Sequence, residues 1–365
     1  MLDLKDGFVL YHGSYCEVKE PDLAKCAKRK DFGKGFYLTT SREQAESFLR
    51  TSIAKAIATG KIETHIFENA DVDWLHCIAA HRKKKMFIEV EREMAKYDII
   101  VGNIAPALTK EAKALKLLQL NSAGFDNYVG VLDKNVKLCT AVGAFSPAVG
   151  EHMLAMTFSI IRHFPEYRDK QLNKDWSDCG KIISVENSTV AVLGLGDIGG
   201  SYARKIKALG AAKVIGVRRN VKNKPDYIDE VYSLKELDKV LPKADIVAMV
   251  LPSSKETVNI INEKTIAMMK NGAYLINVGR GDAIDQNALL SALRTGKLAG
   301  AAIDVTTPEP LPKDSPLWNE PKLLLTPHVA GWFFLDETVN RIIKIAARNI
   351  YSFLHDGELI NVAEH

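Results

Sequence analysis

The chain lacks a long apolar run, because no uninterrupted stretch of its 365 residues reaches the roughly 20 that a membrane-spanning helix needs. The first residues, MLDLKDGFVLYHG, lack a signal-peptide pattern, since charged residues interrupt the apolar ones. Neither charge sign is in large excess: 49 Lys and Arg against 45 Asp and Glu give a net charge of +4. This balance argues against nucleic-acid binding. We predict a cytoplasmic protein that contacts neither membranes nor nucleic acids.

Cysteine pairs are missing as well. The five cysteines are an odd number and none forms a Cys-x-x-Cys pair, so we predict reduced thiols and no metal site. No internal repeat and no Gly- or Ser-rich linker interrupts the chain. Hydrophobic residues make up 47% and charged residues 26%, which is typical of a globular protein. At roughly 100–200 residues per domain, the length suggests two or three domains.

From about residue 97 onward, the chain alternates short apolar runs with amphipathic stretches. The runs are YDIIVG, LKLLQL, VKLCTAV, TVAVLG, KVIGV, ADIVAMV, AYLINVG, AGAAIDV and LLLTPH. Near-continuous apolar strands joined by helices are typical of a parallel sheet buried on both faces. We therefore predict an α/β fold with a doubly wound sheet. A long buried helix should begin at Ser146, and an amphipathic helix should lie within residues 337–357.

A glycine-rich turn carries the strongest local signal. In TVAVLGLGDIGG a predicted strand runs into Gly194, Gly196 and Gly199, and a predicted helix follows. The first glycine permits a tight turn, the second lets the backbone approach a pyrophosphate, and the third allows close packing of helix on strand. The N–H groups at the helix start, around Asp197 and Ile198, would bind the phosphates. Glycine-rich turns also occur for structural reasons alone, so it is the position between strand and helix that indicates a dinucleotide.

The end of the next predicted strand, KVIGV, indicates which dinucleotide is bound. An Asp or Glu usually stands there to hold the ribose 2′-hydroxyl of NAD. Arg218 and Arg219 occupy the place instead, and the nearest acid, Asp226, follows a proline. Two guanidinium groups favour a 2′-phosphate, so we predict NADP(H) as the preferred cofactor and NAD(H) as the second choice. The alternative is that both arginines are simply exposed at the end of a strand.

Three later strands each end beside a chemically useful side chain. Arg280 follows AYLINVG, Asp304 follows AGAAI, and His328 follows LLLTP. Ligands of open parallel sheets bind outside the carboxyl ends of the strands, where these side chains should converge. Arg280 would hold the carboxylate of a 2-oxo acid, and His328 would protonate the developing alkoxide. Glu309 behind the imidazole would orient it and favour its charged form, while Asp304 could hold the nicotinamide.

Each of these residues also has a purely structural explanation. Arg280 could neutralise a helix end, Glu309 could be a turn residue between two prolines, and His328 could be a core histidine with satisfied hydrogen bonds. Their joint position after a dinucleotide-binding loop is what favours catalysis.

These stretches make the sequence similar to the D-isomer-specific 2-hydroxyacid dehydrogenase family over roughly residues 95–361. The matching pieces are LLQLNSAGFDN, SPAVGEH, VLGLGDIG, INVGRG, AAIDVTTPEPLP, SPLW and LTPHVAG. The resemblance implies a Rossmann-type coenzyme domain at 151–333 and a flavodoxin-like substrate domain formed by 96–150 and 334–365. It also implies hydride transfer between NADP(H) and a small 2-oxo or 2-hydroxy acid by a homodimer.

The resemblance further assigns residues to the site. The implied catalytic residues are Arg280, Glu309 and His328. Those expected around the cofactor are Gly194, Gly196, Asp197, Ile198, Gly199, Arg218, Arg219, Pro252, Thr257, Val278, Asp304 and Gly331. Four are expected around the substrate, two through backbone N–H groups and two as aromatic walls: Ala123, Gly124, Phe145 and Trp332.

The first 95 residues depart from that family, whose two opening strand–helix units we do not find, so we expect a truncated substrate domain. They resemble a small bacterial family of uncharacterised function, distantly similar to ADP-ribosyltransferases, in LYHGS, KDFGKGFYLTTSREQA and DVDWLHCIAAHR. In such transferases, residues that match His12, Gly13 and Tyr37 cradle NAD. We therefore predict an α+β module at 1–95, joined to the dehydrogenase part by gene fusion near Tyr97.

Three functions remain open on these grounds. The leading hypothesis is an NADP-dependent reductase of 2-oxo acids, similar to glyoxylate/hydroxypyruvate reductases. If the truncated substrate domain prevents turnover, the chain would instead bind a dinucleotide without reducing a substrate. The third hypothesis is ADP-ribosyl transfer or NAD binding by the N-terminal module. Assays of NADPH oxidation separate the first two, and radiolabelled NAD tests the third.

Overall fold

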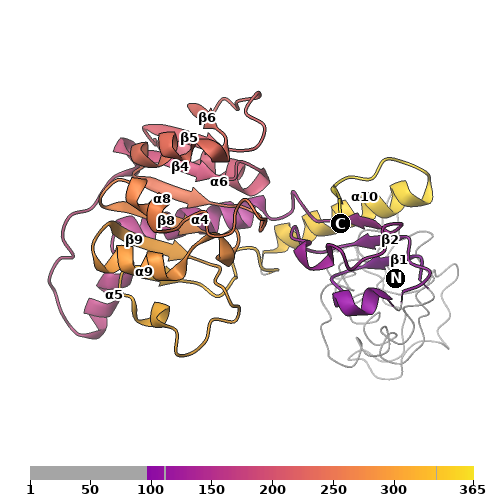
Figure 1. Ribbon diagram of the computed structural model, residues 1–365, viewed down its shortest axis with the longest axis horizontal. Coiled ribbons are helices and arrows are strands. Elements are labelled where there is room, and N and C mark those ends of the chain that lie inside the picture. Colours follow the sequence, from indigo (N-terminus) through magenta and orange to yellow (C-terminus); the bar gives the residue numbers. More distant parts are fainter. Residues whose placement is uncertain (1–96, 111, 334) are drawn as a thin grey trace, which may run out of the picture. The chain divides into compact units, whose positions relative to one another are not determined.

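The computed structural model describes residues 97–110, 112–333 and 335–365, which form two compact units (Figure 1). The described part of the small unit is 97–121 without 111, 127–140 and 342–365; the large unit is 122–126 and 141–341 without 334. The module predicted at 1–95, with its expected NAD-contacting residues, lies outside the described residues.

The described residues of the large unit form the doubly wound sheet that the sequence predicts. Its seven strands are β4 (Thr189–Leu193), β5 (Lys213–Val217), β6 (Glu230–Tyr232), β7 (Ile246–Met249), β8 (Ala273–Asn277), β9 (Leu298–Ile303) and β10 (Leu323–Leu325). All neighbours are parallel, in the order β10-β9-β8-β7-β4-β5-β6. The chain moves outward in opposite directions from β4, so the strand order reverses between β4 and β7. Ligands of such sheets bind at this reversal, outside the carboxyl ends of the strands.

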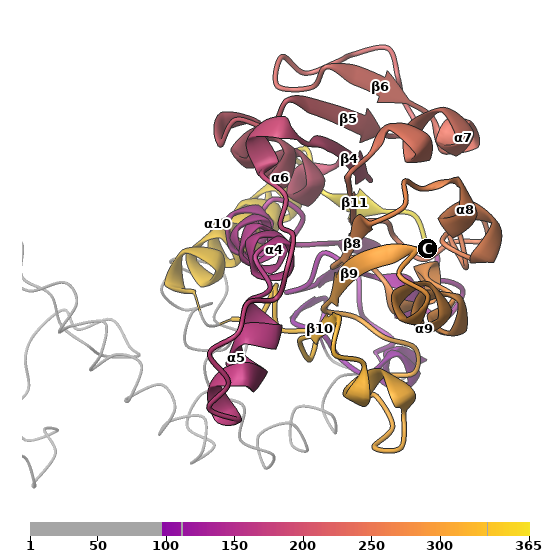
Figure 2. The same cartoon turned by 90° about the vertical axis from the view of Figure 1, so that its left-hand side faces the viewer.

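Helices cover both faces of this sheet (Figure 2). They are α4 (Ser146–Ile161), α5 (Phe164–Leu172), α6 (Asp197–Ala208), α7 (Leu237–Val240), α8 (Glu263–Met268) and α9 (Gln286–Arg294). α4 packs against α6 on one face, while α7, α8 and α9 lie on the other. α4 begins at Ser146 with Pro147 in its first turn, which confirms the predicted start. None of the helices in the described part is long and apolar enough to span a membrane.

Apolar side chains on both faces of the strands form the core of the large unit. Every residue of β7 and β8 is buried, and so is all of β4 and β5 except the first residue of each. Burying one Val, Leu or Ile side chain contributes about 1.5–3 kcal/mol, so these strands dominate the stability of the unit. The apolar runs therefore predicted them correctly. β6 was missed, because its three residues are only partly buried and one of them is Glu230.

The described part of the small unit contains a four-stranded sheet. β1 (Ile99–Val101), β2 (Leu117–Gln119) and β3 (Lys137–Cys139) are parallel, and β11 (Val362–Ala363) pairs antiparallel with β3. The long helix α10 (Asp336–Leu354) belongs to this unit from Ile342 onward. The sequence predicts β1 to β3 and α10. It does not predict β11, which is too short to show a periodic pattern.

Candidate active site

The glycine-rich turn between β4 and α6 leaves open space at the start of the helix. Gly194 has a φ of +97°, and a Cβ atom there would lie 2.3 Å from the carbonyl oxygen of Val250. A Cβ at Gly199 would lie 2.0 Å from the carbonyl oxygen of Gly194, so only glycine permits this contact of helix and strand. A Cβ at Gly196 would meet no atom within 4 Å. Because Asp197 directly follows as the first residue of α6, the N–H groups at the start of this helix can donate hydrogen bonds to a pyrophosphate in that space.

Arg218 and Arg219 follow β5 at the same edge of the sheet. β5 pairs with β4, so its end lies beside the strand that enters the glycine-rich turn. The backbone N–H of Arg218 donates to the carbonyl oxygen of Tyr232 at the end of β6 (3.0 Å), and Arg219 is exposed. The nearest acid, Asp226, is exposed in the following loop. The two arginines thus stand where a dinucleotide bound at the glycine turn would direct its ribose.

The ends of β7 and β8 lie close together beside this turn. A Cβ at Gly279 would lie 2.6 Å from the backbone nitrogen of Leu251, so glycine allows the two chains to meet. In the loop after β7, the buried hydroxyl of Thr257 donates to the carbonyl oxygen of Pro252 (2.6 Å). Val278, the residue after β8, is also buried. These contacts fix the loops that follow β7 and β8 at the carboxyl edge of the sheet, where ligands of such folds bind.

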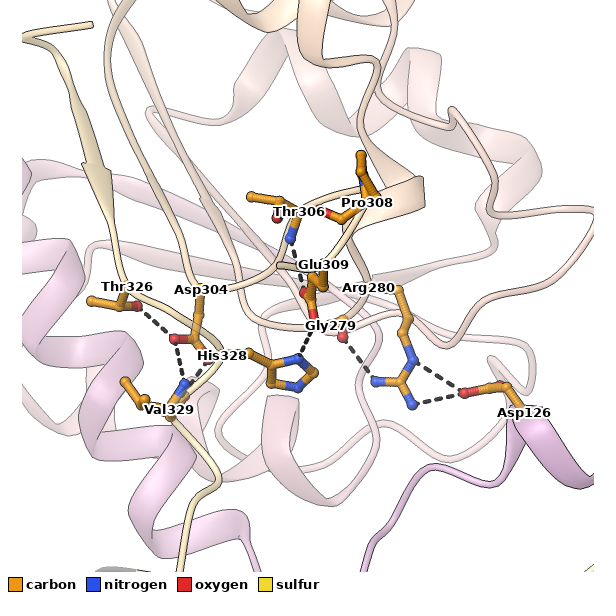
Figure 3. A network of polar contacts seen from close by, with 11 residues as sticks. Asp126, Gly279, Arg280, Asp304, Thr306, Pro308, Glu309, Thr326, His328 and Val329 are labelled. Atoms are coloured by element: carbon orange, nitrogen blue, oxygen red, sulfur yellow. Dashed lines mark hydrogen bonds and ion pairs between the residues drawn. The ribbon is translucent and has the colours of Figure 1, made fainter. Parts of the chain in front are cut away.

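His328 and Glu309 form a hydrogen-bonded pair (Figure 3). Nδ1 of His328 lies 2.8 Å from Oε2 of Glu309, and Oε1 of Glu309 accepts the backbone N–H of Thr306 (3.0 Å). A carboxylate can only accept, so Nδ1 carries the shared proton and Nε2 remains for a substrate. The backbone of His328 is left-handed (φ 53°), a conformation that costs a non-glycine residue about 1–3 kcal/mol. About half of the imidazole is exposed, which leaves it accessible.

Asp304 is buried at the end of β9 and holds the segment that carries His328. Its Oδ1 accepts the hydroxyl of Thr326 (2.6 Å) and the backbone N–H of Val329 (2.9 Å), and its Oδ2 accepts the N–H of Ala330 (3.0 Å). The N–H of His328 donates to the carbonyl oxygen of Asp304 (2.7 Å). These bonds satisfy a carboxylate that is only 1% exposed and stabilise the left-handed turn at His328.

Arg280 lies against the segment 122–126. Its Nε and Nη2 donate to Oδ2 of Asp126 (3.1 and 2.8 Å), and its Nη1 donates to the carbonyl oxygen of Gly279 (2.9 Å). A Cβ at Gly124 would lie 2.1 Å from Nη2 of Arg280, so this glycine lets the guanidinium approach the backbone. The structure therefore brings Arg280 next to Gly124, and Ala123 precedes it in the same segment. In Figure 3 the guanidinium of Arg280 and the imidazole of His328 point to the same side.

The two aromatic residues expected around the substrate differ in burial. Phe145, directly before α4, is buried and packs edge-to-face on Phe333, with ring centroids 6.4 Å apart. A Cβ at Gly331 would lie 3.4 Å from the Phe145 ring, at van der Waals distance, so Gly331 lies next to this ring. Trp332 is 42% exposed. Phe333 is an additional aromatic neighbour that the sequence analysis did not single out.

Two polar partners were missed from the sequence. One is Asp126, which binds Arg280 from 154 residues away. The other is His152 of α4, whose Nε2 lies 3.2 Å from the hydroxyl of Thr326 and 3.8 Å from Oδ1 of Asp304. Both stand in stretches that carry the family resemblance, but no local pattern indicates such distant partners. Within the described ranges, no three His, Cys, Asp or Glu side chains group together as metal ligands would.

A parallel sheet with a dinucleotide turn, and a histidine–carboxylate pair at its carboxyl edge, define a Rossmann-type oxidoreductase. The profile of the D-isomer specific 2-hydroxyacid dehydrogenase NAD-binding domain matches residues 154–330. The profile of a protein family of unknown function, DUF3990, matches residues 8–122.

Individual relatives extend this similarity beyond the NAD-binding domain. D-lactate dehydrogenase of Treponema pallidum is 34% identical over 63% of this chain and 72% of its own. Glyoxylate reductase of Thermofilum pendens is 30% identical over 72% of this chain and 78% of its own. The solved structure of an NADPH-dependent glyoxylate/hydroxypyruvate reductase from Sinorhizobium meliloti, in complex with NADP and sulfate, has a TM-score of 0.67 at 28% identity, covering 74% of this chain and 85% of its own.

The chain belongs to the D-isomer specific 2-hydroxyacid dehydrogenase family, whose members are NAD(P)-dependent oxidoreductases. This confirms the resemblance on which the sequence analysis drew. The similarity of the first residues to ADP-ribosyltransferases stays a prediction.

Proposed function

We propose that this chain uses NADPH to reduce small 2-oxo acids, such as glyoxylate and hydroxypyruvate, to 2-hydroxy acids. The observation that carries the proposal is the 2.8 Å pair of His328 and Glu309, on the same unit and at the same sheet edge as the glycine-rich turn. The names of the Thermofilum and Sinorhizobium relatives support glyoxylate and hydroxypyruvate as the first substrates to test.

His328 would act as the general acid. Glu309 accepts from Nδ1, so Nε2 of the imidazolium holds the proton that the substrate carbonyl oxygen takes up. The buried Asp304 contributes by holding the turn that aims the imidazole. When bound, NADPH would supply the hydride to the carbonyl carbon. Proton and hydride together convert a 2-oxo acid into a 2-hydroxy acid.

Arg280 would bind the substrate carboxylate. Its guanidinium is planar and permanently charged, and it matches a carboxylate with two parallel hydrogen bonds. The backbone N–H groups of Ala123 and Gly124 would add donors on the side where Gly124 meets the guanidinium. Phe145 and Trp332 would border the substrate side chain.

The residues at the glycine-rich turn fit NADPH. The open position at Gly196 and the start of α6 would hold the pyrophosphate, and Arg218 and Arg219 would pair with the 2′-phosphate. The loops that contain Pro252, Thr257, Val278 and Gly331 would border the rest of the cofactor, as expected from the family.

The direct test is NADPH oxidation, followed by absorbance, with glyoxylate, hydroxypyruvate, pyruvate and longer 2-oxo acids. Rapid turnover of at least one of them is expected. NADPH binding without turnover of any acid would favour the alternative function, a dinucleotide-binding protein with an inactive substrate domain. ADP-ribosyl transfer by residues 1–95, which are outside the described part, is tested separately with radiolabelled NAD and candidate acceptors.

A homodimer is the expected assembly. Helix α5 and the loop after it expose large apolar side chains: Phe164 (59%), Leu172 (64%) and Trp176 (102%). Such a cluster on one segment favours a protein contact. Light scattering should give twice the chain mass, and Trp176→Ser should weaken the dimer.

The free thiols of Cys139 and Cys179 support a reducing, cytoplasmic compartment.

A further inference from the structure

The ion pair between Arg280 and Asp126 uses one particular edge of the guanidinium. An arginine has five N–H groups. Nε and Nη2 each donate one to Oδ2 of Asp126, at 3.1 and 2.8 Å. Nη1 donates one to the carbonyl oxygen of Gly279, at 2.9 Å. Among the described residues no acceptor binds the remaining N–H of Nη1 or that of Nη2, and these are the two at the far end of the fork.

The carboxylate of Asp126 is an unexpected neighbour for an arginine that binds an anionic substrate. Its negative charge weakens the attraction of the site for a second carboxylate. An arginine without such a partner, however, moves among many rotamers, and the loss of this freedom when a ligand fixes it opposes binding. The contact with Asp126 therefore weakens the attraction of Arg280 for a carboxylate but fixes the orientation of its guanidinium.

The segment that carries Asp126 is itself held in place. The hydroxyl of Ser122 donates to the carbonyl oxygen of Gly124 (2.7 Å), which closes a tight loop. The position of a Cβ at Gly124 would be 3.3 Å from Cζ of Arg280 and 3.6 Å from Oδ2 of Asp126. The guanidinium thus packs against the backbone of this loop, and Asp126 binds it along its Nε–Nη2 edge.

We propose that Asp126 is a positioning residue, which holds the Nε–Nη2 edge of Arg280 so that the Nη1–Nη2 end faces the carboxylate of the 2-oxo acid. This inference rests on the proposed function of Arg280 in substrate binding. Asp126 then acts on substrate affinity through Arg280 and does not affect the cofactor.

The kinetic test uses Asp126→Asn, which keeps one oxygen acceptor but removes the charge. The KM for glyoxylate should rise roughly five- to fiftyfold, because an unrestrained guanidinium loses rotamer freedom when the substrate fixes it, and the KM for NADPH should change less than about twofold. Asp126→Glu, which retains the charge, should recover part of the affinity. Asp238→Asn, the same change at an exposed position of α7, is the matched control and should behave like the wild type.

A double-mutant cycle with Arg280→Lys shows whether Asp126 acts through the arginine. Lysine keeps the charge but has no fork to orient. In that background Asp126→Asn should raise the KM for glyoxylate by less than about twofold, so the two effects should not add. Additive effects, or an unchanged KM in Asp126→Asn alone, would overturn the proposal.

A chemical measurement separates this inference from the proposed function. Phenylglyoxal modifies accessible guanidinium groups, and peptide mass spectrometry gives the rate at Arg280 in the whole protein. Release of the pair in Asp126→Asn should raise that rate several-fold over wild type and Asp238→Asn. If no 2-oxo acid is reduced, the proposed function fails while this rate still reports the pair. An unchanged rate in a folded Asp126→Asn variant would show that Asp126 does not hold the arginine.

Discussion

The sheets of the two units are stabilised in different ways. In the large unit, β7 and β8 are buried along their whole length, and all but one of their side chains, that of Asn277, are hydrophobic. In the small unit, β1 to β3 have three residues each, and a polar pair is buried in their midst. Gln119 of β2 and Asn349 of α10 are both 0% exposed, and Nδ2 of Asn349 donates to Oε1 of Gln119 (2.7 Å).

The polar pair also fixes the C-terminal segment of the small unit. Asn349 accepts the backbone N–H of Ile360 (2.8 Å) and donates to its carbonyl oxygen (3.0 Å), shortly before β11 begins. Short strands provide few ladder hydrogen bonds, so side-chain bonds add the specificity that the ladder lacks. The comparison shows that the large unit is stabilised by long buried strands and carries its candidate catalytic residues at the edge of the sheet, whereas the small unit adds a buried polar pair to its apolar core.

The largest effect is expected from His328→Ala at the rim of the large unit. General acid catalysis contributes roughly 10²–10⁴-fold, so kcat with glyoxylate should fall by that factor. The melting temperature and the KM for NADPH should change little, because the imidazole is half exposed. Steady-state kinetics and calorimetry check this. Normal turnover in His328→Ala would mean that another group is the acid.

The next effect concerns the cofactor preference of the large unit. NADPH should bind roughly ten- to several-hundredfold more tightly than NADH, since charge-assisted hydrogen bonds contribute about 1.5–3 kcal/mol each. Replacing Arg218 and Arg219 by alanine together should abolish most of that preference. Lys222→Ala removes a charge from the same exposed loop and serves as the control. Equal Michaelis constants of the wild type for the two cofactors would contradict the assignment.

A third prediction concerns the stability of the small unit. Asn349→Leu removes the partner of Gln119 and of Ile360, and an unsatisfied buried polar group costs about 1–3 kcal/mol. We therefore expect the free energy of unfolding to fall by about 2–4 kcal/mol in urea titrations. Arg348→Ala, at the exposed neighbouring position of α10, should be nearly neutral. Equal stability of Asn349→Leu and wild type would mean that the polar pair does not stabilise this sheet.

The same contrast explains how much the sequence could predict. Apolar runs predict the long strands and the glycine spacing predicts the dinucleotide turn, because burial and backbone geometry act locally. β6 is held by ion pairs of Glu230 with Lys213 and Lys243. The hydrogen bonds from these two lysines lower the pKa of Glu230 to about 2. A strand of this kind shows no periodic pattern of hydrophobic residues in the sequence.

The sequence could not predict long-range polar contacts for the same reason. Arg280 and His328 are recognisable because each follows a strand. Asp126 is recognisable only through its partner, since a guanidinium 154 residues away gives it its role. Sequence patterns thus predict the parts of the site that depend on local structure, and miss those that depend on which loops meet.

The smallest effect is expected at a polar contact within the large unit, at the start of α5. His163 has Nδ1 3.0 Å from Oε1 of Glu166 and Nε2 3.1 Å from the carbonyl oxygen of Lys181. Both partners only accept, so the ring can donate to both only as the imidazolium. Burial alone would lower the pKa of His163, but the hydrogen bonds to Glu166 and Lys181 raise it above its usual value.

A raised folded-state pKa means that the protonated ring stabilises the fold. This contribution is complete below the unfolded pKa of about 6.5 and is lost as the pH rises through the folded pKa. His163→Gln should therefore cost about 1 kcal/mol more at pH 5.5 than at pH 8.5, measured by urea unfolding at both values. Glu166→Gln, which removes the charge beside the ring, should reduce that difference. Equal destabilisation by His163→Gln at both pH values would contradict this prediction. It would mean that the neutral imidazole binds the carbonyl oxygen of Lys181, and that this contact contributes the same stability at both pH values.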